Sequence, residues 1–329
     1  MNHLKFPREL LAHRSAGLAL ITASLFAAVT AFYPQFATLA NARDSLDDTA
    51  ILILLALGEM FVILTGAIDL SVAANVAFTG LCVALMNHAA PGIPVGLLLA
   101  AAVGIGACLG LLNGVLVWQL SIPPIVVTLG TLAIFRGLAY IISGGGWVNS
   151  GDMSMAFMDL PRRVWMGLSL LSWLATLSVA LAVIFLRFSA TGRHLYAAGN
   201  NPKAAAYVGV NVGRAQCIAF MVCGALAGLS GYLWVARFAV AYSGIANGFE
   251  LTVIAACVIG GISITGGSGT VVGLLFGCLF LGVIKNALPL LGVSAFWQMA
   301  VSGAVIVGAV TANAAHRTPR QRILEAADP

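Results

Sequence analysis

The feature that most constrains this chain is a succession of long apolar runs separated by short polar segments. Residues 95–118 contain no charged side chain, and residues 166–186 contain none either. A helix needs about 20 consecutive and mostly apolar residues to cross the hydrocarbon core of a bilayer. Each of these runs is therefore long enough to span a membrane.

The composition excludes a soluble protein with unusually apolar helices. Charged residues make up 8% and hydrophobic residues 60% of the 329 residues, and the mean hydropathy is +1.01. Ordinary soluble domains contain roughly 25% charged residues, and a chain of this size could not cover its surface with so few. We therefore predict an all-α polytopic membrane protein.

Glycine is abundant, with 37 residues, and small residues let helix backbones approach closely within membranes. Spacings of four residues occur at Gly106, Gly110 and Gly114, and again at Gly224 and Gly228. We expect these positions to mark close contacts between helices.

The polar segments predict how the chain is threaded. Residues 187–214 carry four basic side chains and no acidic one, whereas residues 41–48 contain three aspartates and one arginine. Basic residues favour the cytoplasmic side of a membrane, so we expect residues 187–214 to form a cytoplasmic loop. We expect about ten spans, with both termini in the cytoplasm. The expected spans are residues 16–33, 49–66, 71–88, 95–118, 122–142, 166–186 and 215–235, followed by three pieces between residues 251 and 311.

This threading divides the chain into three parts. They are a cytoplasmic N-terminal segment of residues 1–15, a transmembrane domain of residues 16–312, and a cytoplasmic tail of residues 313–329.

The sequence contains no arrangement typical of an enzyme or a metalloprotein. The five histidines are scattered over loops and span ends, unlike metal ligands. The six cysteines lie within or beside apolar runs, which argues against a disulfide framework. None of the lysines lies in the G-x-x-x-x-G-K-S/T arrangement that cradles nucleotide phosphates. We expect no catalytic residue, no metal, no cofactor and no nucleic-acid partner.

One carboxylate, Asp69, lies in the otherwise apolar stretch LTGAIDLSV of residues 64–72. The segment GAIDLS of residues 66–71 has a counterpart in GGISIT of residues 260–265, and both are interrupted by glycine. Broken helices in two halves expose backbone groups, which are tolerated at membrane depth only beside a cavity or within protein. The pattern predicts broken helices, two related halves and a solute path. A second and compatible interpretation is that glycine allows tight packing and that Asp69 caps a helix beginning at Leu70.

We predict that polar side chains and the glycines of both segments line the path. A solute with many hydroxyl groups needs hydrogen-bonding partners that do not hold it too tightly, so we expect a smooth polar path without a deep pocket. The predicted path residues are Asp69, Ser71, Asn75, Asn113, Thr128, Gly260, Gly261 and Ser263. Glu59 and Arg136 cost roughly 2.5–3.5 kcal/mol each on insertion scales and should face the bundle interior, as partners or in structural roles.

Four stretches resemble, in this order and at this spacing, the permease subunits of ribose-type monosaccharide ABC importers, in the branched-chain amino acid/ribose permease family. They are GAIDLSV, PPIVVTLGTLAIFRGLAYIISGG, TGRHLYAAGNNPKAAAYVGVNV and ELTVIAACVIGGISITGGSGTVVG, and the likeness runs from about Thr49 to Gln298. One departure is that Ala67 and Ala73 replace glycines of the family's usual GGIDLSVG, which puts the local backbone flexibility in question.

The resemblance implies a multi-pass permease of the bacterial inner membrane that translocates a monosaccharide or a related polyhydroxylated solute. It implies pairing with a second copy or a sister permease, delivery of solute by a periplasmic sugar-binding protein, and energy from a separate cytoplasmic ABC ATPase. Which sugar or polyol is carried stays open at this point.

The segment of residues 203–209 fits the E-A-A-x-x-x-G loop by which ABC importers contact their ATPase, with lysine in place of glutamate. The predicted coupling residues are Lys203, Ala204, Ala205 and Gly209, in a short helix started by Asn201-Pro202. The other interpretation is a basic loop that only fixes the topology.

A proton-coupled secondary transporter with Asp69 or Glu59 as the proton carrier is the alternative function, because broken helices in two halves suit it as well. The feature that discriminates is the coupling segment, which a secondary transporter has no reason to possess.

Overall fold

The computed structural model of the protein describes residues 6–290, 292, 297, 300, 303–304 and 307–308. The described chain is almost entirely helical. Its α-helices are α1 (Phe6–Phe32), α2 (Leu39–Leu64), α3 (Val72–Ala89), α4 (Val95–Gln119), α5 (Pro124–Ser143), α6 (Met155–Asp159), α7 (Leu170–Phe188), α8 (Ala190–Asn200), α9 (Pro202–Tyr207), α10 (Val212–Phe238), α11 (Phe249–Ile259) and α12 (Val271–Leu290).

Four two-residue strands form two antiparallel pairs. Strand β1 (Val148–Asn149) pairs with β4 (Val240–Ala241), and β2 (Val164–Trp165) pairs with β3 (Leu168–Ser169). Short 3-10 turns cover Pro34–Ala37 and Ser150–Asp152. The strands only tie loops together, so the prediction of an all-α membrane protein is confirmed.

Seven helices of the described chain, α1, α3, α4, α5, α7, α10 and α12, are long and apolar enough to cross a membrane. Two further predicted spans correspond to α2, which carries Asp47, Asp48 and Glu59, and to α11, which has only 11 residues. The last predicted span, after residue 292, lies mostly outside the described residues.

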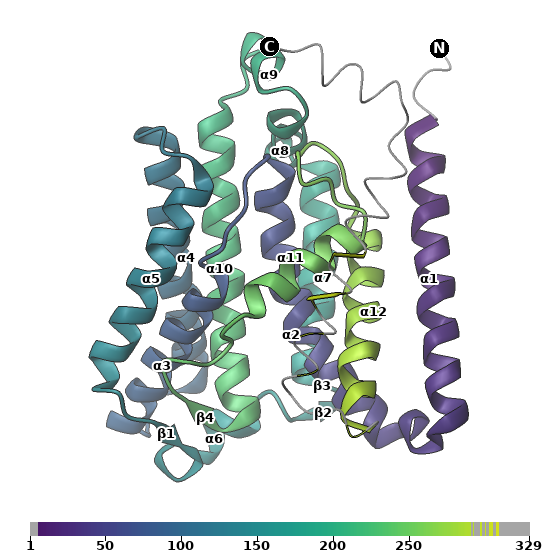
Figure 1. The fold of residues 1–329 in the computed structure, drawn as a ribbon. Helices are drawn as coiled ribbons and strands as arrows, with labels where there is room; N and C mark the ends of the chain where they lie inside the picture. The colour runs from purple at the N-terminus through teal and green to yellow at the C-terminus, as the bar shows by residue number, and fades with distance from the viewer. Residues whose placement is uncertain are drawn as a thin grey trace.

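The helices form one bundle with two distinct ends (Figure 1). Helices α8 and α9 lie at one end, hereafter the α9 end, and α1 begins near it. The strand pairs and α6 lie at the opposite end, hereafter the α6 end. The N-terminal helix therefore starts at the same end as the basic loop of residues 187–214, as the predicted threading requires.

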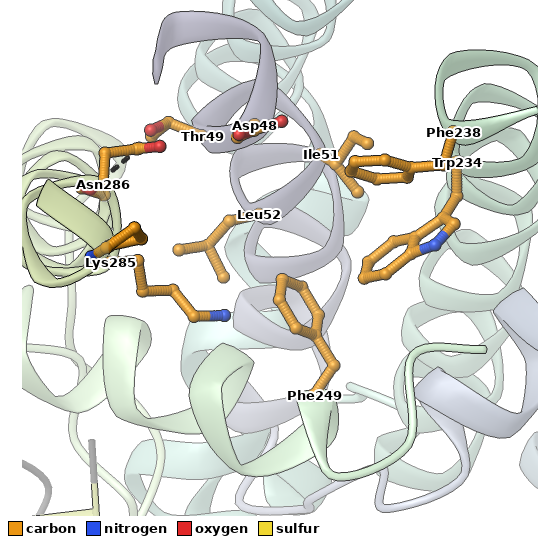
Figure 2. A pocket seen from close by; sticks show the side chains of 11 residues that line it. Asp48, Thr49, Ile51, Leu52, Trp234, Phe238, Phe249, Lys285 and Asn286 are labelled. Atoms are coloured by element: carbon orange, nitrogen blue, oxygen red, sulfur yellow. Dashed lines mark hydrogen bonds between the residues drawn. The ribbon is translucent and has the colours of Figure 1, made fainter. Parts of the chain in front are cut away.

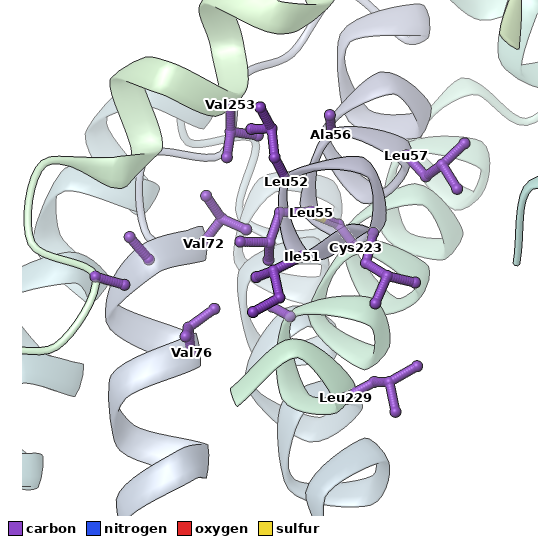
Figure 3. Packing of buried hydrophobic residues seen from close by; sticks show 14 of the residues in the cluster. Ile51, Leu52, Leu55, Ala56, Leu57, Val72, Val76, Cys223, Leu229 and Val253 are labelled. Carbon is purple, nitrogen blue, oxygen red and sulfur yellow. The ribbon is translucent and has the colours of Figure 1, made fainter. Parts of the chain in front are cut away.

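Helix α2 runs through the centre of the bundle, and nearly every residue from Thr49 to Leu64 is buried. It packs against α10, α12, α7 and α11, whereas α1 packs mainly along α12 at the periphery. Figure 3 shows part of the buried core, in which apolar side chains of α2, α3, α10 and α11 pack together.

The most extensive helix contact joins α4 and α10, and it is close because glycines on both helices have no side chain. A Cβ added to Gly106 would overlap the carbonyl oxygen of Gly224 and lie 2.7 Å from the Cα of Gly228. A Cβ on Gly114 would lie 2.7 Å from the Cα of Cys217. The sequence prediction that these glycine spacings mark close helix contacts is confirmed.

The alanine variant of Gly106 should destabilise the protein, because its methyl group would meet backbone atoms that cannot move aside. We expect the free energy of unfolding to fall by about 1–3 kcal/mol, the usual cost of overpacking, in thermal denaturation of the purified protein. Gly104→Ala on the same helix is the matched control, since no atom lies within 4 Å of an added Cβ there. Equal stability of the two variants would contradict the assigned contact.

Candidate functional site

The first helix break lies between α2 and α3. Helix α2 ends at Leu64, and Gly66, two residues later, has a φ of +79°, a left-handed conformation that favours glycine. The N–H of Gly66 donates to the carbonyl of Ile63 (2.9 Å), and the N–H of Ala67 donates to that of Val62 (3.4 Å). These bonds satisfy carbonyls at the helix end and turn the chain back into the bundle.

A network of buried polar side chains holds the returning chain. One carboxylate oxygen of Asp69 accepts from the N–H (2.9 Å) and the hydroxyl (2.6 Å) of Ser71. The N–H of Asp69 donates to Glu59 Oε1 (3.0 Å), and the side-chain amide of Asn113 donates to the Ser71 hydroxyl (2.8 Å). Asp69 is only 2% exposed, and Glu59 and Asn113 are fully buried.

The hydrogen bond between Asp69 and Glu59 shows how far the chain after α2 runs back alongside that helix. Glu59 lies five residues before the end of α2, which is about 7.5 Å along a helix axis. Its bond to Asp69 therefore places the break beside the body of α2. Helix α3 begins at Val72 with Ser71 as its N-cap, two residues later than the predicted start at Leu70. Asp69 accepts a backbone N–H beside that start, but it is not the N-cap itself.

Two further predicted path residues lie around the same break. The side-chain amide of Asn75 donates to the carbonyl of Gly106 (3.2 Å), and Thr128 donates to the carbonyl of Ile68 (3.4 Å). Both side chains are buried. Five of the eight predicted path residues are thus brought together, and all five are buried within a single chain.

The second break, between α11 and α12, ends its helix in the same way as the first. Gly261 has a φ of +84°. Its N–H donates to the carbonyl of Val258 (3.0 Å), and the N–H of Ile262 donates to that of Cys257 (3.0 Å). Gly66 therefore corresponds to Gly261, one residue later than the alignment with Gly260 from the sequence. The predicted path residue Ser263 lies just beyond, where its N–H donates to the carbonyl of Ser268 (3.0 Å).

The two breaks touch one another and the end of α8. The N–H of Gly267 donates to the carbonyl of Leu64 (3.0 Å). A Cβ on Gly266 would lie 2.7 Å from the nitrogen of Gly66 and 2.9 Å from the Cα of Gly199. A Cβ on Gly199 would lie 2.6 Å from the nitrogen of Gly267 and overlap the Leu64 carbonyl. We call this contact of Gly66, Gly199, Gly266 and Gly267 the glycine junction.

Sequence reasoning missed Gly199, Gly266 and Gly267. The available signal was weak, since it consisted only of the pair Gly266-Gly267 beyond the second break and a glycine just before the coupling segment. Nothing in one sequence indicates that backbones so far apart in the chain meet.

The predicted coupling segment forms helix α9, directly after the junction. The Asn201 side chain accepts from the N–H of Ala204 (2.9 Å), and Gly209, at a φ of +84°, follows the helix. Lys203 and Ala204 are exposed, but Ala205 is only 5% exposed and faces the protein.

The outward surface at the C-terminal end of α9 is apolar. Tyr207 is 92% exposed and Val208 is 80% exposed, both at the tip of the α9 end. The exposed face of this segment therefore combines Lys203 and Ala204 with two large side chains that the sequence analysis did not single out.

Of the two roles left open for Glu59 and Arg136, partners or structural residues, the described contacts favour the structural one, because the two side chains bind different groups. The Arg136 guanidinium donates to the carbonyls of Ser243 (2.8 Å) and Ile245 (2.7 Å), so it anchors the loop before α11. Glu59 instead accepts from the N–H of Asp69.

A cavity of about 250 Å³ lies toward the α6 end, between α2, α10, α11 and α12 (Figure 2). The sequence predicts a path without a deep pocket, and none of the predicted path residues lines this cavity. The lining residues are Asp48, Thr49, Ile51, Leu52, Trp234, Phe238, Phe249, Gly282, Lys285, Asn286 and Pro289.

Comparison with known proteins identifies relatives along nearly the whole chain. The family described as branched-chain amino acid transport system / permease component matches residues 41–310. The autoinducer 2 import system permease protein LsrC of Salmonella typhi is 34% identical over 312 residues, which cover 95% of this chain and 89% of that protein. The ribose import permease protein RbsC of Escherichia coli K12 is 35% identical over 311 residues, which cover 93% of this chain and 94% of that protein. No solved structure matches the chain significantly.

The network at the first break predicts a contrast between two substitutions of Asp69. Asp69→Asn keeps a carbonyl oxygen that can accept from Ser71, whereas Asp69→Leu leaves both Ser71 donors unsatisfied, at about 1–3 kcal/mol for each buried group. We expect Asp69→Leu to lower the free energy of unfolding clearly more than Asp69→Asn in denaturation of the purified protein.

Asp44→Leu is the control for this pair. The Asp44 side chain is 75% exposed, and its 3.7 Å ion pair with Arg237 should contribute little. An Asp69→Leu variant as stable as Asp44→Leu would contradict the role assigned to the Asp69 carboxylate.

Proposed function

We propose that this chain, which belongs to the family of permease components of branched-chain amino acid transport systems, is the membrane-spanning subunit of an ABC importer. It carries a monosaccharide or a related polyhydroxylated solute across the bacterial inner membrane. The observation that carries the proposal is the similarity over more than nine tenths of the chain to permeases named for ribose and autoinducer 2 import.

The proposed partners supply the functions for which this chain has no motif of its own. It has no phosphate-binding motif for ATP, so a separate cytoplasmic ABC ATPase supplies the energy. A periplasmic sugar-binding protein delivers the solute, and a second copy or a sister permease completes the pair in the membrane. The α9 end, which carries the basic loop of residues 187–214, faces the cytoplasm together with both termini.

Helix α9 is the proposed contact with the ATPase. It is short and capped by Asn201, and it presents Ala204, Tyr207 and Val208 at the tip of the bundle. A short helix with small and apolar side chains suits a groove on a partner protein. Ala205 contributes differently, because its buried side chain packs α9 onto the bundle.

The glycine junction is the proposed route from α9 to the solute path. Gly199 lies three residues before the start of α9 and contacts both helix breaks through backbone atoms. Backbone contacts of this kind leave no flexible side chain to absorb a displacement, and packed interiors transmit strain. A movement of α9 is therefore passed to both breaks, and through Asp69 and Ser71 to the polar network.

The proton-coupled alternative is less well supported by the same geometry. Asp69 accepts two hydrogen bonds from Ser71 in a closely packed site, as a fixed structural acceptor does. The exposed Tyr207 and Val208 have no role in a transporter without an ATPase.

Uptake into reconstituted vesicles separates the two functions. With the binding protein and the ATPase present, we expect uptake to require ATP and to be indifferent to an imposed pH gradient. Asp69→Asn should keep a substantial part of that uptake, because an amide oxygen still accepts from Ser71. Transport that follows the pH gradient without ATP and disappears in Asp69→Asn would establish the proton-coupled alternative instead.

Two sets of variants distinguish binding of the ATPase at α9 from coupling of α9 to the helix breaks through the glycine junction. Tyr207→Ala combined with Val208→Ala should lose the ATPase on co-purification. Gly199→Ala should retain the ATPase and its ATP hydrolysis, but uptake should fall at least about tenfold, equivalent to 1.4 kcal/mol in the transport barrier.

Gly130→Ala is the control for the added methyl group, since nothing lies within 4 Å of a Cβ there. Normal uptake by a folded Gly199→Ala complex would rule out the junction as the route of coupling.

A further inference from the structure

The cavity between α2, α10, α11 and α12 (Figure 2) is lined by residues of the first half of α2 and the last turns of α10. These parts of the two helices lie toward the end of the bundle opposite to α9 (Figure 1). Its volume of about 250 Å³ is several times the roughly 30 Å³ that one water molecule occupies in the liquid. It is therefore large enough for a small organic solute. None of the predicted path residues lines it, so it is a separate site in the same chain.

The walls of the cavity are apolar and aromatic. The rings of Trp234 and Phe249 meet edge to face with their centroids 5.1 Å apart. Leu52 lies between them and α12 in Figure 2. A cavity with apolar walls and a few polar groups is the usual construction of a small-molecule site. Aromatic rings offer flat faces to the C–H groups of a sugar ring.

The polar groups of the cavity are incompletely satisfied by the protein. The ammonium of Lys285 lies 4.3 Å from the centroid of the Phe249 ring and donates a hydrogen bond to no described residue. The indole N–H of Trp234 likewise has no acceptor within the described part of the chain. Asn286 donates to the carbonyl of Gly282 (2.9 Å), which leaves its side-chain oxygen available as an acceptor.

An acidic group completes the set. One carboxylate oxygen of Asp48 accepts from Arg237 Nε (2.8 Å), and its other oxygen is not engaged by any described residue. The cavity thus combines donors from Lys285 and Trp234 with acceptors from Asn286 and Asp48. The negative charge of Asp48 offsets the positive charge of Lys285. The site therefore has no net positive charge from this pair to attract a simple anion.

We infer that this cavity is a binding site for a polyhydroxylated solute within each permease chain. Hydroxyl groups both donate and accept, so they match a site that offers unpaired groups of both kinds. The inference rests on the proposed function, and it adds an entry site at the end that faces the binding protein. The solute would occupy it before it reaches the helix breaks.

Lysine footprinting tests the site directly, because the chain has only the lysines Lys5, Lys203 and Lys285. The purified full-length permease in nanodiscs is treated with a small water-soluble acylating reagent, and modification is measured by mass spectrometry. D-ribose, D-galactose and xylitol serve as probes, and exposed Lys203 is the internal control. We expect at least one probe to slow acylation of Lys285 severalfold and to leave Lys203 unchanged.

Three results would overturn the inference. Lys285 could resist acylation under all conditions, which would show that the cavity is closed to solutes. Acylation could proceed equally with and without all three probes. L-leucine could protect Lys285 better than every polyol, which would assign the cavity to a different class of solute.

Variants connect the site to transport. Trp234→Leu and Asn286→Ala should abolish the protection and raise the KM of uptake about tenfold, equivalent to 1.4 kcal/mol of binding energy. ATP hydrolysis and maximal uptake should change much less. Trp234→Phe should restore part of the affinity by returning an aromatic face. Trp165→Leu, at a residue that is 61% exposed on β2, is the control for loss of an indole.

The outcome also separates this inference from the proposed function. Wild-type protein without ATP-dependent uptake would refute the importer, whatever the footprint of Lys285. Normal uptake with an unprotected Lys285 and an unchanged KM in the variants would refute only the cavity.

Discussion

The structure depends on how backbone groups freed at two helix breaks are satisfied inside the bundle. Water is absent from hydrocarbon, so an N–H that leaves a helix there must find a partner within the protein. The first break uses side chains, because Glu59 and Asp69 each accept a backbone N–H. The second break uses the backbone, since Ser263 and Gly267 donate to carbonyls. Both breaks stop their helix with the same glycine turn, but only the first requires buried carboxylates.

Close backbone contacts occur in two places with different roles, between the helices α4 and α10 and at the glycine junction. Gly106, Gly110 and Gly114 let α4 lie against α10, which also packs on α2 and α3. Because glycines let the two backbones touch along much of both helices, this contact is rigid and holds the centre of the bundle together. The glycine junction uses the same close approach at the ends of elements. There it connects the breaks to α8 instead of fixing two helix bodies.

The sequence predicted the local features well and the long-range ones poorly. Apolar runs and charge clusters located the helices, and Asn201-Pro202 located α9, because these signals are carried by neighbouring residues. The predicted start of α3 at Leu70 and the predicted alignment of Gly66 with Gly260 were each wrong by one or two residues, and the partners of Arg136 could not be predicted, since each is decided by tertiary contacts. The cavity could not be predicted at all. Lys285 and Trp234 lie 51 residues apart in the sequence, and only the fold brings them to one cavity.

The same helices connect the cavity to the glycine junction. Helix α2 carries Leu52 at the cavity and Leu64 at the junction, and α11 carries Phe249 at the cavity and leads to the second break. Helix α12 returns from that break to Lys285. Because helices are stiff, a shift at one end alters the spacing of the side chains at the other. Binding free energies coupled in this way are reciprocal. If the inferred solute favours one spacing in the cavity and the proposed ATPase favours one position of α9, each must change the affinity of the protein for the other by the same factor.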